Sequence, residues 1–269
     1  MVFFAEHLFL FMKVTIITVT LNSEKFLEDC ILSVRSQDYK NIEHIIIDGK
    51  STDGTLAIIE KYKDHIAKWV SEKDYSMYDA INKGMAMATG DLIGTLNSDD
   101  IFASTNVISK IVQSYKEQQV DAVYGDLQFV EPQNTAAVTR IWRGKKFKRS
   151  RFRYGWMPAH PTFYFKRELL EQYGYYETHY FTACDFEFML RYLYRCRVSA
   201  YYIPQLIVKM RSGGLSNGNL KRRLRVNRRD YLAMKKNKVP FAFFVSFLQP
   251  VLKLHQYKWS MHKLFSWLH

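Results

Sequence analysis

The amino-acid sequence predicts an α/β protein in which helices flank a mainly parallel central sheet, with a helical extension at the C-terminal end. Two observations carry this prediction. In the first hundred residues, short apolar runs alternate with longer amphipathic segments, which is the pattern of βαβ units. The runs, such as VTIITV at residues 14–19, are rich in β-branched side chains, as expected of strands that are covered on both faces.

The first half is expected to contain four strands and three helices in alternation. Apolar runs place the strands at residues 14–19, 42–47, 66–70 and 92–96. The first helix is expected to follow a cap at Asn22-Ser23, and the second to cover 56–62 after the turn sequence at 51–54. The third is marked by apolar residues at helical spacing from Met77 to Ala88. Strands joined in this way lie parallel, with right-handed crossovers.

The alternation loosens after residue 121. Strands are expected at 122–124, 128–130, 162–165, 198–203 and 206–210. Helices are expected at 101–115, 167–173, 185–195 and 220–234, the last with a very basic face. Residues 140–153 carry many cations and no acid, which predicts a basic loop, and SGGLS at 212–216 predicts a flexible one. The tail at 241–268 is apolar and aromatic with interspersed lysines.

Length, charge and cysteine content narrow the class of protein. A chain of 269 residues with 48% hydrophobic content can form one large domain with an appendage. The net charge of +13 favours an anionic partner, such as nucleotide phosphates, anionic lipid or nucleic acid. The three cysteines form neither a zinc pattern nor a disulfide framework, so a reducing cytoplasm is the simplest setting.

The N-terminal residues do not have the pattern of a targeting segment. Residues 1–11 lack a basic region and a small-residue cleavage site, and they are too short to span a bilayer. Met12-Lys13 is a second plausible start, so residues 1–12 are expected to be an extension of the fold.

An acidic sequence follows the fourth expected strand. The run at 92–96 ends in Asn97-Ser98-Asp99-Asp100, which places carboxylates at the C-terminal edge of the sheet, where open α/β sheets bind ligands. Adjacent acids suit a hard divalent cation such as Mg²⁺ or Mn²⁺. The alternative is a cap for the helix expected at 101–115, because Ser and Asp are common N-cap residues.

Several motifs, in this order and spacing, resemble family 2 glycosyltransferases of the GT-A fold. They are ITVTLNS at 17–23, IIIDGKSTDGT at 45–55, SEKDYSMYDAINKGMAMATGD at 71–91, LNSDD at 96–100, HPTFYFKREL at 160–169, ACDFEFMLR at 183–191 and SGGLS at 212–216. MYDAINKG with a late Gly-Gly-Leu-Ser is similar to colanic-acid and related exopolysaccharide transferases. The chain departs from the family pattern at Asn97, usually the first Asp of an Asp-x-Asp motif, and at Lys50, usually a small residue.

The resemblance implies a division into a nucleotide-sugar half at 13–100 and an acceptor half at 101–218. Basic, amphipathic C-terminal helices are expected at 219–269. It implies that Asp48 contacts the base of a nucleoside-diphosphate donor, with uracil the usual base; an Asx turn before Gly49 is the alternative. For Asp79 and Lys83, the resemblance implies a place in the donor site, and a surface ion pair between them is the alternative. The donor-binding residues are then Thr18, Thr20, Asn22, Asp48, Glu72, Asp79, Lys83, Asn97 and Ser98.

For catalysis, the resemblance implies a metal-dependent inverting transferase of the hexosyl or N-acetylhexosaminyl type. Asp99 would ligate Mn²⁺ or Mg²⁺, and Asp100 would complete the shell or cap the next helix. Asp185 would be the catalytic base, which is compatible with a role as N-cap of a helix at 186–195. His160, at the start of an expected strand, and Arg191 would lie on the acceptor side, although Glu187 and Arg191 are spaced to form a structural brace.

The expected acceptor is a glycan, free or linked to a polyprenyl diphosphate, in polysaccharide biosynthesis. The basic and apolar C-terminal segments favour a peripheral position at the cytoplasmic face of a membrane, while packing on the sheet or a homodimer contact through the C-terminal helices are alternatives. No nucleic-acid motif accompanies the basic stretches. A sugar-nucleotidyltransferase would show a Gly-rich loop after the first strand, which is absent, and a non-catalytic glycan- or lipid-binding scaffold is a further alternative.

Overall fold

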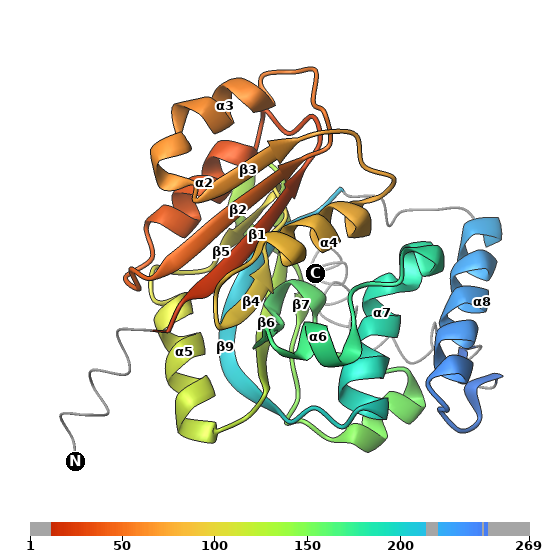
Figure 1. Cartoon of the computed structure of the whole chain (residues 1–269). Helices are drawn as coiled ribbons and strands as arrows, with labels where there is room; N and C mark the ends of the chain where they lie inside the picture. The colour runs from red at the N-terminus through yellow and green to blue at the C-terminus, as the bar shows by residue number, and fades with distance from the viewer. Residues whose placement is uncertain (1–11, 214–219, 244, 247–269) are drawn as a thin grey trace, which may run out of the picture.

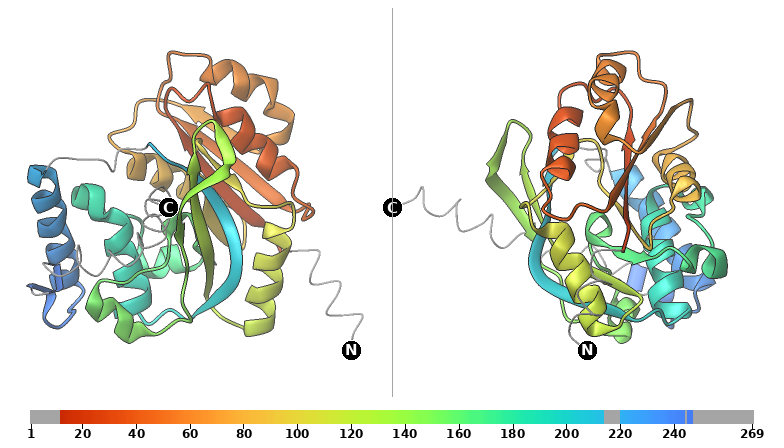
Figure 2. Two further views of the ribbon diagram at one scale, coloured as in Figure 1. Left: turned by 180° about the vertical axis from the view of Figure 1, so that it is seen from behind. Right: turned by 60° about the vertical axis from the view of Figure 1, so that its left-hand side comes forward.

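The computed structural model describes residues 12–213, 220–243, 245 and 246. Its centre is one sheet in the order β3-β2-β1-β4-β8-β6-β9-β5, with β7 paired to β6 outside this path. Helices cover both faces of the sheet, and α8 stands at one side of the molecule beside α7 (Figures 1 and 2). The expected N-terminal extension, the loop at 214–216 and most of the apolar tail lie outside the described residues.

The first half has the predicted alternation of four parallel strands with helices. The strands are β1 (Val14–Thr20), β2 (Ile42–Asp48), β3 (Lys68–Ser71) and β4 (Leu92–Thr95). Between them lie α2 (Leu27–Arg35), α3 (Thr55–Lys61), the 3₁₀ turn η1 (Lys63–His65) and α4 (Met77–Met87). The cap expected at Asn22-Ser23 is wrong: α2 begins after Phe26, because Asn22 has a positive φ of 50° and turns the chain first.

Alternate side chains of the strands supply the cores on the two faces of the sheet. Ile16 packs with the face covered by α2 and α5, and its neighbour Ile17 packs with the face covered by α4 and α7. Gly84 of α4 lies directly on Ile17, since a Cβ there would come within 2.4 Å of the Ile17 side chain. Close packing of this kind fixes α4 and the residues it carries against the sheet.

The second half is more irregular and mixes parallel with antiparallel pairs. Its strands are β5 (Asp100–Phe102), β6 (Ala122–Glu131), β7 (Asn134–Trp142), β8 (Tyr164–Lys166) and β9 (Ala200–Arg211). Its helical elements are α5 (Val107–Gln118), η2 (Arg149–Tyr154), η3 (His160–Thr162), α6 (Leu169–Tyr173), η4 (Thr178–Ala183), α7 (Cys184–Met189), the π-helical η5 (Leu190–Arg195) and α8 (Leu220–Lys236).

Three expectations for this half are wrong. The four short strands expected at 122–130 and 198–210 are two long strands, β6 and β9, which pair with each other in parallel through an irregular register. The basic stretch at 140–153 is not one loop, because β7 and η2 occupy its two ends. The helix expected from residue 101 begins at Val107, since β5 pairs with β9 first.

The basic helix expected at 220–234 is confirmed and extends to Lys236. Among the described residues, none of the helices combines the length and the apolar content that crossing a bilayer would need.

Candidate active site

The register of the parallel strands brings the predicted donor-binding residues to one edge of the sheet. Thr20, Asp48 and Ser71, the last residues of three neighbouring strands, are in register with one another. The loop at 97–100 follows the fourth strand, β4, at the same edge. Ser98 Oγ lies 2.8 Å from Ser23 Oγ, which ties this loop to the turn after β1.

Asp48 is fully buried, and its carboxylate is engaged by neighbouring groups of the protein. The Ser51 N–H donates to Oδ2 at 3.0 Å, and the Ser71 hydroxyl donates to the same oxygen at 2.6 Å. The Ser51 hydroxyl donates to Oδ1 at 2.5 Å. These contacts form the local turn given as the alternative to base recognition.

The three polar residues at the end of β1 have different surroundings. The Thr18 side chain is fully buried in the core, with its hydroxyl 3.0 Å from His44 Nε2, so it does not face the edge. The Thr20 hydroxyl is buried and lacks a hydrogen-bond partner among the described residues. Asn22 is exposed, and its Oδ1 accepts the Thr52 N–H at 2.9 Å. Of the three, Thr20 therefore has unused hydrogen-bonding capacity.

Lys83 of α4 joins three carboxylates beside the same edge. Its Nζ lies 2.6 Å from Asp74, 2.7 Å from Glu72 and 3.9 Å from Asp79. The hydrogen bond that Lys83 donates to Asp74, followed by the one to Glu72, raises the Lys83 pKa above its usual range. Asp79 also accepts the Tyr75 N–H at 3.1 Å, so it helps to cap α4 together with Ser76, the N-cap residue. The expected Asp79–Lys83 pair is therefore the longest of three ion pairs.

The loop at 97–100 contains buried oxygen atoms that none of the described residues satisfies. Asn97 Nδ2 donates to Asp100 Oδ2 at 3.3 Å, while Asn97 Oδ1 and Asp100 Oδ1 have no hydrogen-bond partner among the described residues. Asp100 has no exposed surface, and burial, with the neighbouring Asp99 charge, raises its pKa well above the usual value. Burial also raises the pKa of Asp99, and the positive charge of the nearby Arg211 acts in the opposite direction. Buried polar atoms without partners are uncommon, and a bound ion or water molecule is one explanation for them.

Arg211, a residue that the sequence did not single out, holds this loop from the end of β9. Its guanidinium donates to the Asp99 carbonyl oxygen at 2.9 Å and to Asp29 at 2.5 Å, and it stacks on Phe26. The expectation that Asp100 caps the next helix is wrong, because Asp100 belongs to β5 and the N-cap of α5 is Asn106.

The donor set of the loop fits a hard divalent cation in part. Carboxylate and amide oxygens of Asp99, Asp100 and Asn97 are the ligand types that Mg²⁺ and Mn²⁺ prefer. Among the described residues, however, there is no group of three or more His, Cys, Asp or Glu side chains placed to hold a metal ion. A cation at this loop would thus need further ligands, and phosphate oxygens of a substrate are suited to that role.

Asp185 lies within an aromatic cluster on the other side of the site. Tyr78 of α4 packs against Tyr176, with ring centroids 5.2 Å apart, and against His160 at 6.4 Å. Burial raises the pKa of both tyrosines, and the Asp185 charge adds to each rise. Burial lowers the pKa of His160. The Nε2 atom of this residue is buried without a hydrogen-bond partner among the described residues. Asp185, Tyr78, Tyr176 and a neutral His160 therefore lie close together.

Two structural expectations for this region are wrong. Asp185 is not an N-cap: α7 begins at Cys184 after Ala183, and Asp185 Oδ1 accepts the N–H of the next residue, Phe186, at 2.8 Å. His160 does not begin a strand but starts the 3₁₀ turn η3, because Pro161 at its second position fixes a helical φ. Both residues still face the same cluster.

Arg191 is confirmed as the partner of Glu187 and is directed at protein groups. Its Nη2 lies 3.1 Å from Glu187 Oε2, and its guanidinium donates to the carbonyl oxygens of Gly174 at 3.0 Å and Tyr175 at 2.6 Å. Glu187 is fully buried and also accepts from Asn237 at 3.2 Å and Lys236 at 3.4 Å. This cluster joins α7 to the end of α8.

Sequence reasoning missed Tyr176 and Arg211. Tyr176 is tied to α4 by two hydrogen bonds between its backbone and the Asn82 amide, at 2.9 and 3.0 Å. The only local signal was the shared face of Tyr78 and Asn82, which are four residues apart on α4. Nothing local marks Arg211, because its partners are distant in the sequence.

The comparisons with known proteins identify the family and the fold. The model of the family described as "Glycosyl transferase family 2" matches residues 15–174, more than half of the chain. An uncharacterized glycosyltransferase of Mycobacterium tuberculosis is 32% identical over 181 residues, which cover 66% of this chain and 68% of that protein. A PGL/p-HBAD biosynthesis glycosyltransferase of Mycobacterium bovis is 26% identical over 208 residues, covering 76% of this chain and 78% of that protein.

Solved structures share the fold at lower identity. S. aureus TarS 1-349 in complex with UDP has a TM-score of 0.65 at 20% identity, covering 83% of this chain and 65% of that one. This chain spans 39% of a longer S. aureus TarS structure. The mannosyltransferase PcManGT from Pyrobaculum calidifontis, in complex with GDP-Man and Mn²⁺, has a TM-score of 0.61 at 20% identity, covering 91% and 69% of the two chains. The expected α/β, GT-A-like fold is therefore confirmed.

The family match, the relatives and the fold agree with the motifs from which the resemblance was inferred. They also decide against the sugar-nucleotidyltransferase and scaffold alternatives. The chain belongs to glycosyl transferase family 2, and it is a glycosyltransferase.

Proposed function

We propose that this protein is an inverting, metal-dependent transferase that moves a sugar from a nucleoside-diphosphate donor, with UDP as the nucleotide, to a glycan acceptor. The observation that carries the proposal is a pair of buried oxygen atoms, on Asn97 and Asp100 at the C-terminal edge of the sheet, that have no partner among the described residues. They leave a polar site where a cation and a diphosphate would complete the hydrogen bonding and charge balance. The UDP complex of TarS and the GDP-Man and Mn²⁺ complex of PcManGT support it.

The donor would lie along the strand ends, between the turn after β1 and the loop at 97–100. Thr20 has an unused hydroxyl for this role, and Ser98 and Asn22 lie on the same edge. Asp99 and Asp100, with Asn97, would hold Mn²⁺ or Mg²⁺. When bound, the cation would neutralise negative charge on the departing nucleoside diphosphate. Lys83, with its three carboxylate neighbours, would contribute a fixed cation near the diphosphate.

Asp185 would act as the base. Its carboxylate would accept the proton of the acceptor hydroxyl as the acceptor oxygen bonds to C1 of the sugar and the bond from C1 to the phosphate oxygen breaks. Among the described residues, this carboxylate accepts one hydrogen bond, from the Phe186 N–H to Oδ1, which leaves Oδ2 for an acceptor. The rings of Tyr78 and Tyr176 would exclude water beside it. His160, neutral and with a free Nε2, would orient the acceptor.

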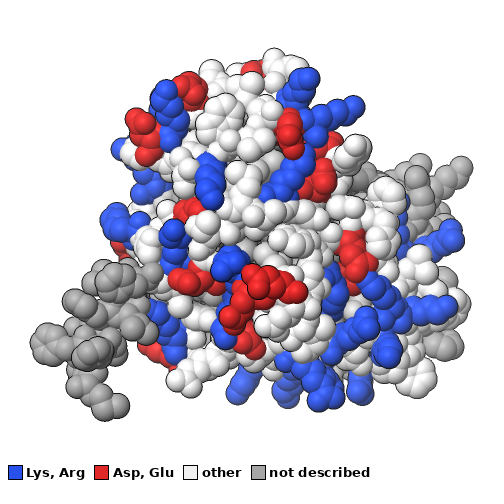
Figure 3. Space-filling view, viewed as in Figure 1, with Lys and Arg blue, Asp and Glu red and all other residues white. Residues whose placement is uncertain are grey.

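The acceptor is proposed to be a glycan, free or carried on a polyprenyl diphosphate, and the enzyme to work at the cytoplasmic face of a membrane. Lys and Arg side chains gather on the part of the surface where α7 and α8 lie, whereas acids and bases alternate around α2 to α4 (Figure 3). Such a one-sided basic face suits an anionic lipid surface.

The test combines donor hydrolysis with donor binding. With Mn²⁺ present, release of UDP from a panel of UDP-sugars should be detectable, with GDP-Man as comparison, and EDTA should abolish it. Asp185→Asn should lower turnover by about 10²- to 10⁴-fold while the thermal shift given by UDP and Mn²⁺ is unchanged. Asp64→Asn, at an exposed acid on η1, is the matched control. Near wild-type turnover of Asp185→Asn would exclude it as the base, and full activity in EDTA would exclude the metal.

A further inference from the structure

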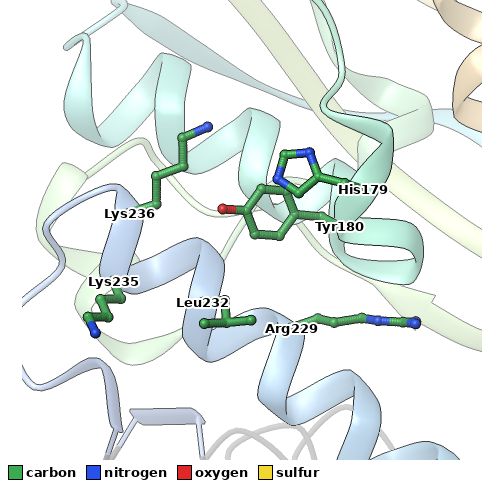
Figure 4. A pocket seen from close by; sticks show the side chains of 6 residues that line it. All are labelled: His179, Tyr180, Arg229, Leu232, Lys235 and Lys236. Atoms are coloured by element: carbon green, nitrogen blue, oxygen red, sulfur yellow. The ribbon is translucent and has the colours of Figure 1, made fainter.

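A second concave site lies away from the strand ends, between η4 and α8. The cavity has a volume of about 560 Å³ and is lined by His179, Tyr180, Arg229, Leu232, Lys235 and Lys236. Figure 4 shows the Tyr180 ring in the middle of the lining, with its hydroxyl toward Lys236, and Arg229 at the opposite end. The site therefore combines an apolar centre with cations at its ends.

The spacing of residues on α8 produces this arrangement. Arg229, Leu232 and Lys236 are three and seven residues apart, so they lie along one face of the helix. Two helical turns, about 10 Å along the helix axis, separate Arg229 from Lys236. The opposite wall is η4, which contributes the Tyr180 ring and the exposed imidazole of His179.

Two of the cations that line this pocket, Arg229 and Lys235, are not balanced by carboxylates in the described part of the chain. Lys236 is paired with Glu177 and with the buried Glu187. In contrast, no carboxylate of the described residues lies within ion-pair distance of Arg229 or Lys235. The Arg229 guanidinium instead stacks on the Phe181 ring at 4.3 Å and donates to the Thr182 hydroxyl at 3.2 Å. An arginine ordered by a ring and a hydroxyl keeps donors available for an anion.

The position of the pocket along the chain relates it to the candidate base. Its wall η4 runs directly into α7, and Thr182, which Arg229 contacts, precedes Asp185 by three residues. Phe181, under the guanidinium, has a positive φ of 53° with 58% of its surface exposed. A non-glycine residue in that conformation costs energy, and such residues cluster at functional sites. The pocket is thus adjacent to the segment that carries Asp185.

We propose that this η4–α8 pocket binds a phosphate or diphosphate group of the acceptor, with Arg229 and Lys235 as the anion-binding cations and Leu232 and Tyr180 contacting the apolar group attached to it. The proposal rests on the proposed function, in which Asp185 receives the acceptor. It assigns the acceptor to the phosphorylated class and separates its anion site from the donor's diphosphate site at the strand ends. Arginine suits this role because its planar donors match phosphate oxygens.

The test uses farnesyl diphosphate, inorganic pyrophosphate and farnesol as probes of the full-length protein. All titrations are done in EDTA, and binding is followed by the NMR shift of the His179 imidazole, a reporter inside the pocket. Farnesyl diphosphate is expected to shift His179, and Arg229→Gln is expected to weaken this binding about tenfold. Arg229→Gln with Lys235→Gln should weaken it further. Lys110→Gln, at an exposed lysine on α5, is the matched control and should bind as the wild type does.

The three probes distinguish the source of the phosphate. Tighter binding of farnesyl diphosphate than of pyrophosphate assigns a lipid-carried group, and equal binding assigns a water-soluble one. Farnesol binding as tightly as farnesyl diphosphate would overturn the proposal, as would an unchanged His179 signal or wild-type affinity in the double variant. Asp185→Asn should bind the probes normally, so a failure of the catalytic assignment and a failure of the pocket give different results.

Discussion

Two fully buried carboxylates, Asp100 and Glu187, lie in different halves of the molecule and have opposite surroundings. Asp100, the first residue of β5, receives one long side-chain hydrogen bond from Asn97 and leaves Oδ1 without a partner among the described residues. Glu187, on α7, accepts from Arg191, Asn237 and Lys236. The same chemical group is thus left open in one region and saturated in the other.

The difference supports a ligand-binding role for Asp100, as proposed, and a structural role for Glu187. Removing one member of a saturated buried ion pair leaves uncompensated charge, so Glu187 should matter most for stability. An unsatisfied buried acid costs the fold free energy, and the cation proposed to bind there would offset that cost. This contrast can be tested by changing each acid and measuring unfolding and ligand binding separately.

The largest expected effect is on stability, from Glu187→Ala. This change leaves Arg191 buried without its carboxylate and removes an acceptor of Lys236 and Asn237. We expect a loss of about 3–5 kcal/mol in the free energy of unfolding, measured by urea denaturation. Glu117→Ala, at an exposed position of α5, should change it by less than about 0.5 kcal/mol. A loss at Glu187 as small as this control would break the comparison.

The second prediction concerns His44, a buried titratable residue whose ring forms a hydrogen bond with the Thr18 hydroxyl. Burial lowers its pKa from 6.5 to about 4, so the folded state holds it neutral while the unfolded state protonates first as the pH falls. The stabilising contribution of the neutral His44 ring is complete above pH 6.5 and is lost as the pH falls from 6.5 to 4. Wild type should lose about 3 kcal/mol more than His44→Gln over this interval, measured by denaturation at each pH. Parallel pH profiles of the two proteins would refute this.

The third prediction is the counterpart of the first, at Asp100. Asp100→Asn keeps the shape of the side chain but removes the negative charge. The affinity for Mn²⁺ in the presence of UDP should fall about 10- to 100-fold, measured by calorimetry. The free energy of unfolding should stay within about 1 kcal/mol of wild type, because no ion pair is broken. A severe loss of stability with unchanged metal affinity would reverse the roles assigned to the two acids.

The smallest effect is expected at Lys83, which is intermediate between the two cases. It has three carboxylate neighbours, but 28% of its side chain is exposed, so solvent screens the pairs. Lys83→Met should lower the free energy of unfolding by less than about 1 kcal/mol. The thermal shift given by UDP should fall more clearly if this lysine contacts the diphosphate. An unchanged shift would assign Lys83 to α4 alone.

The parts of the fold that local sequence determines were predictable, and the parts that depend on distant pairing were not. The third helix of the first half follows from the spacing of Met77, Ala80, Ile81 and Met85, and its observed span is Met77–Met87. The strands β6 and β9 were each divided in two, because their continuity depends on pairing with each other. The Asp100 cap failed for the same reason, since β5 exists only through β9.

For the candidate site, sequence motifs located the strand ends and Asp185 but could not show which atoms were already satisfied. Asp48 is occupied by Ser51 and Ser71, whereas Thr20 is not. The role of Tyr176 arises from packing on Tyr78 of a helix almost a hundred residues earlier. Hydrogen-bond satisfaction is a property of three-dimensional packing, so residue type and spacing do not determine it.

The attachment of the acidic loop to β9 has a consequence for how the protein folds. Arg211 and the Asp99 carbonyl oxygen that it holds are 112 residues apart in the chain, and β5 pairs with the same late strand. Contacts between segments so distant form slowly, because the intervening loop must close first. During synthesis, the four parallel strands are complete long before residue 211 emerges. The edge proposed to bind the donor would therefore form only after the second half of the chain has folded. A chain that stops before residue 211 would then not bind the donor.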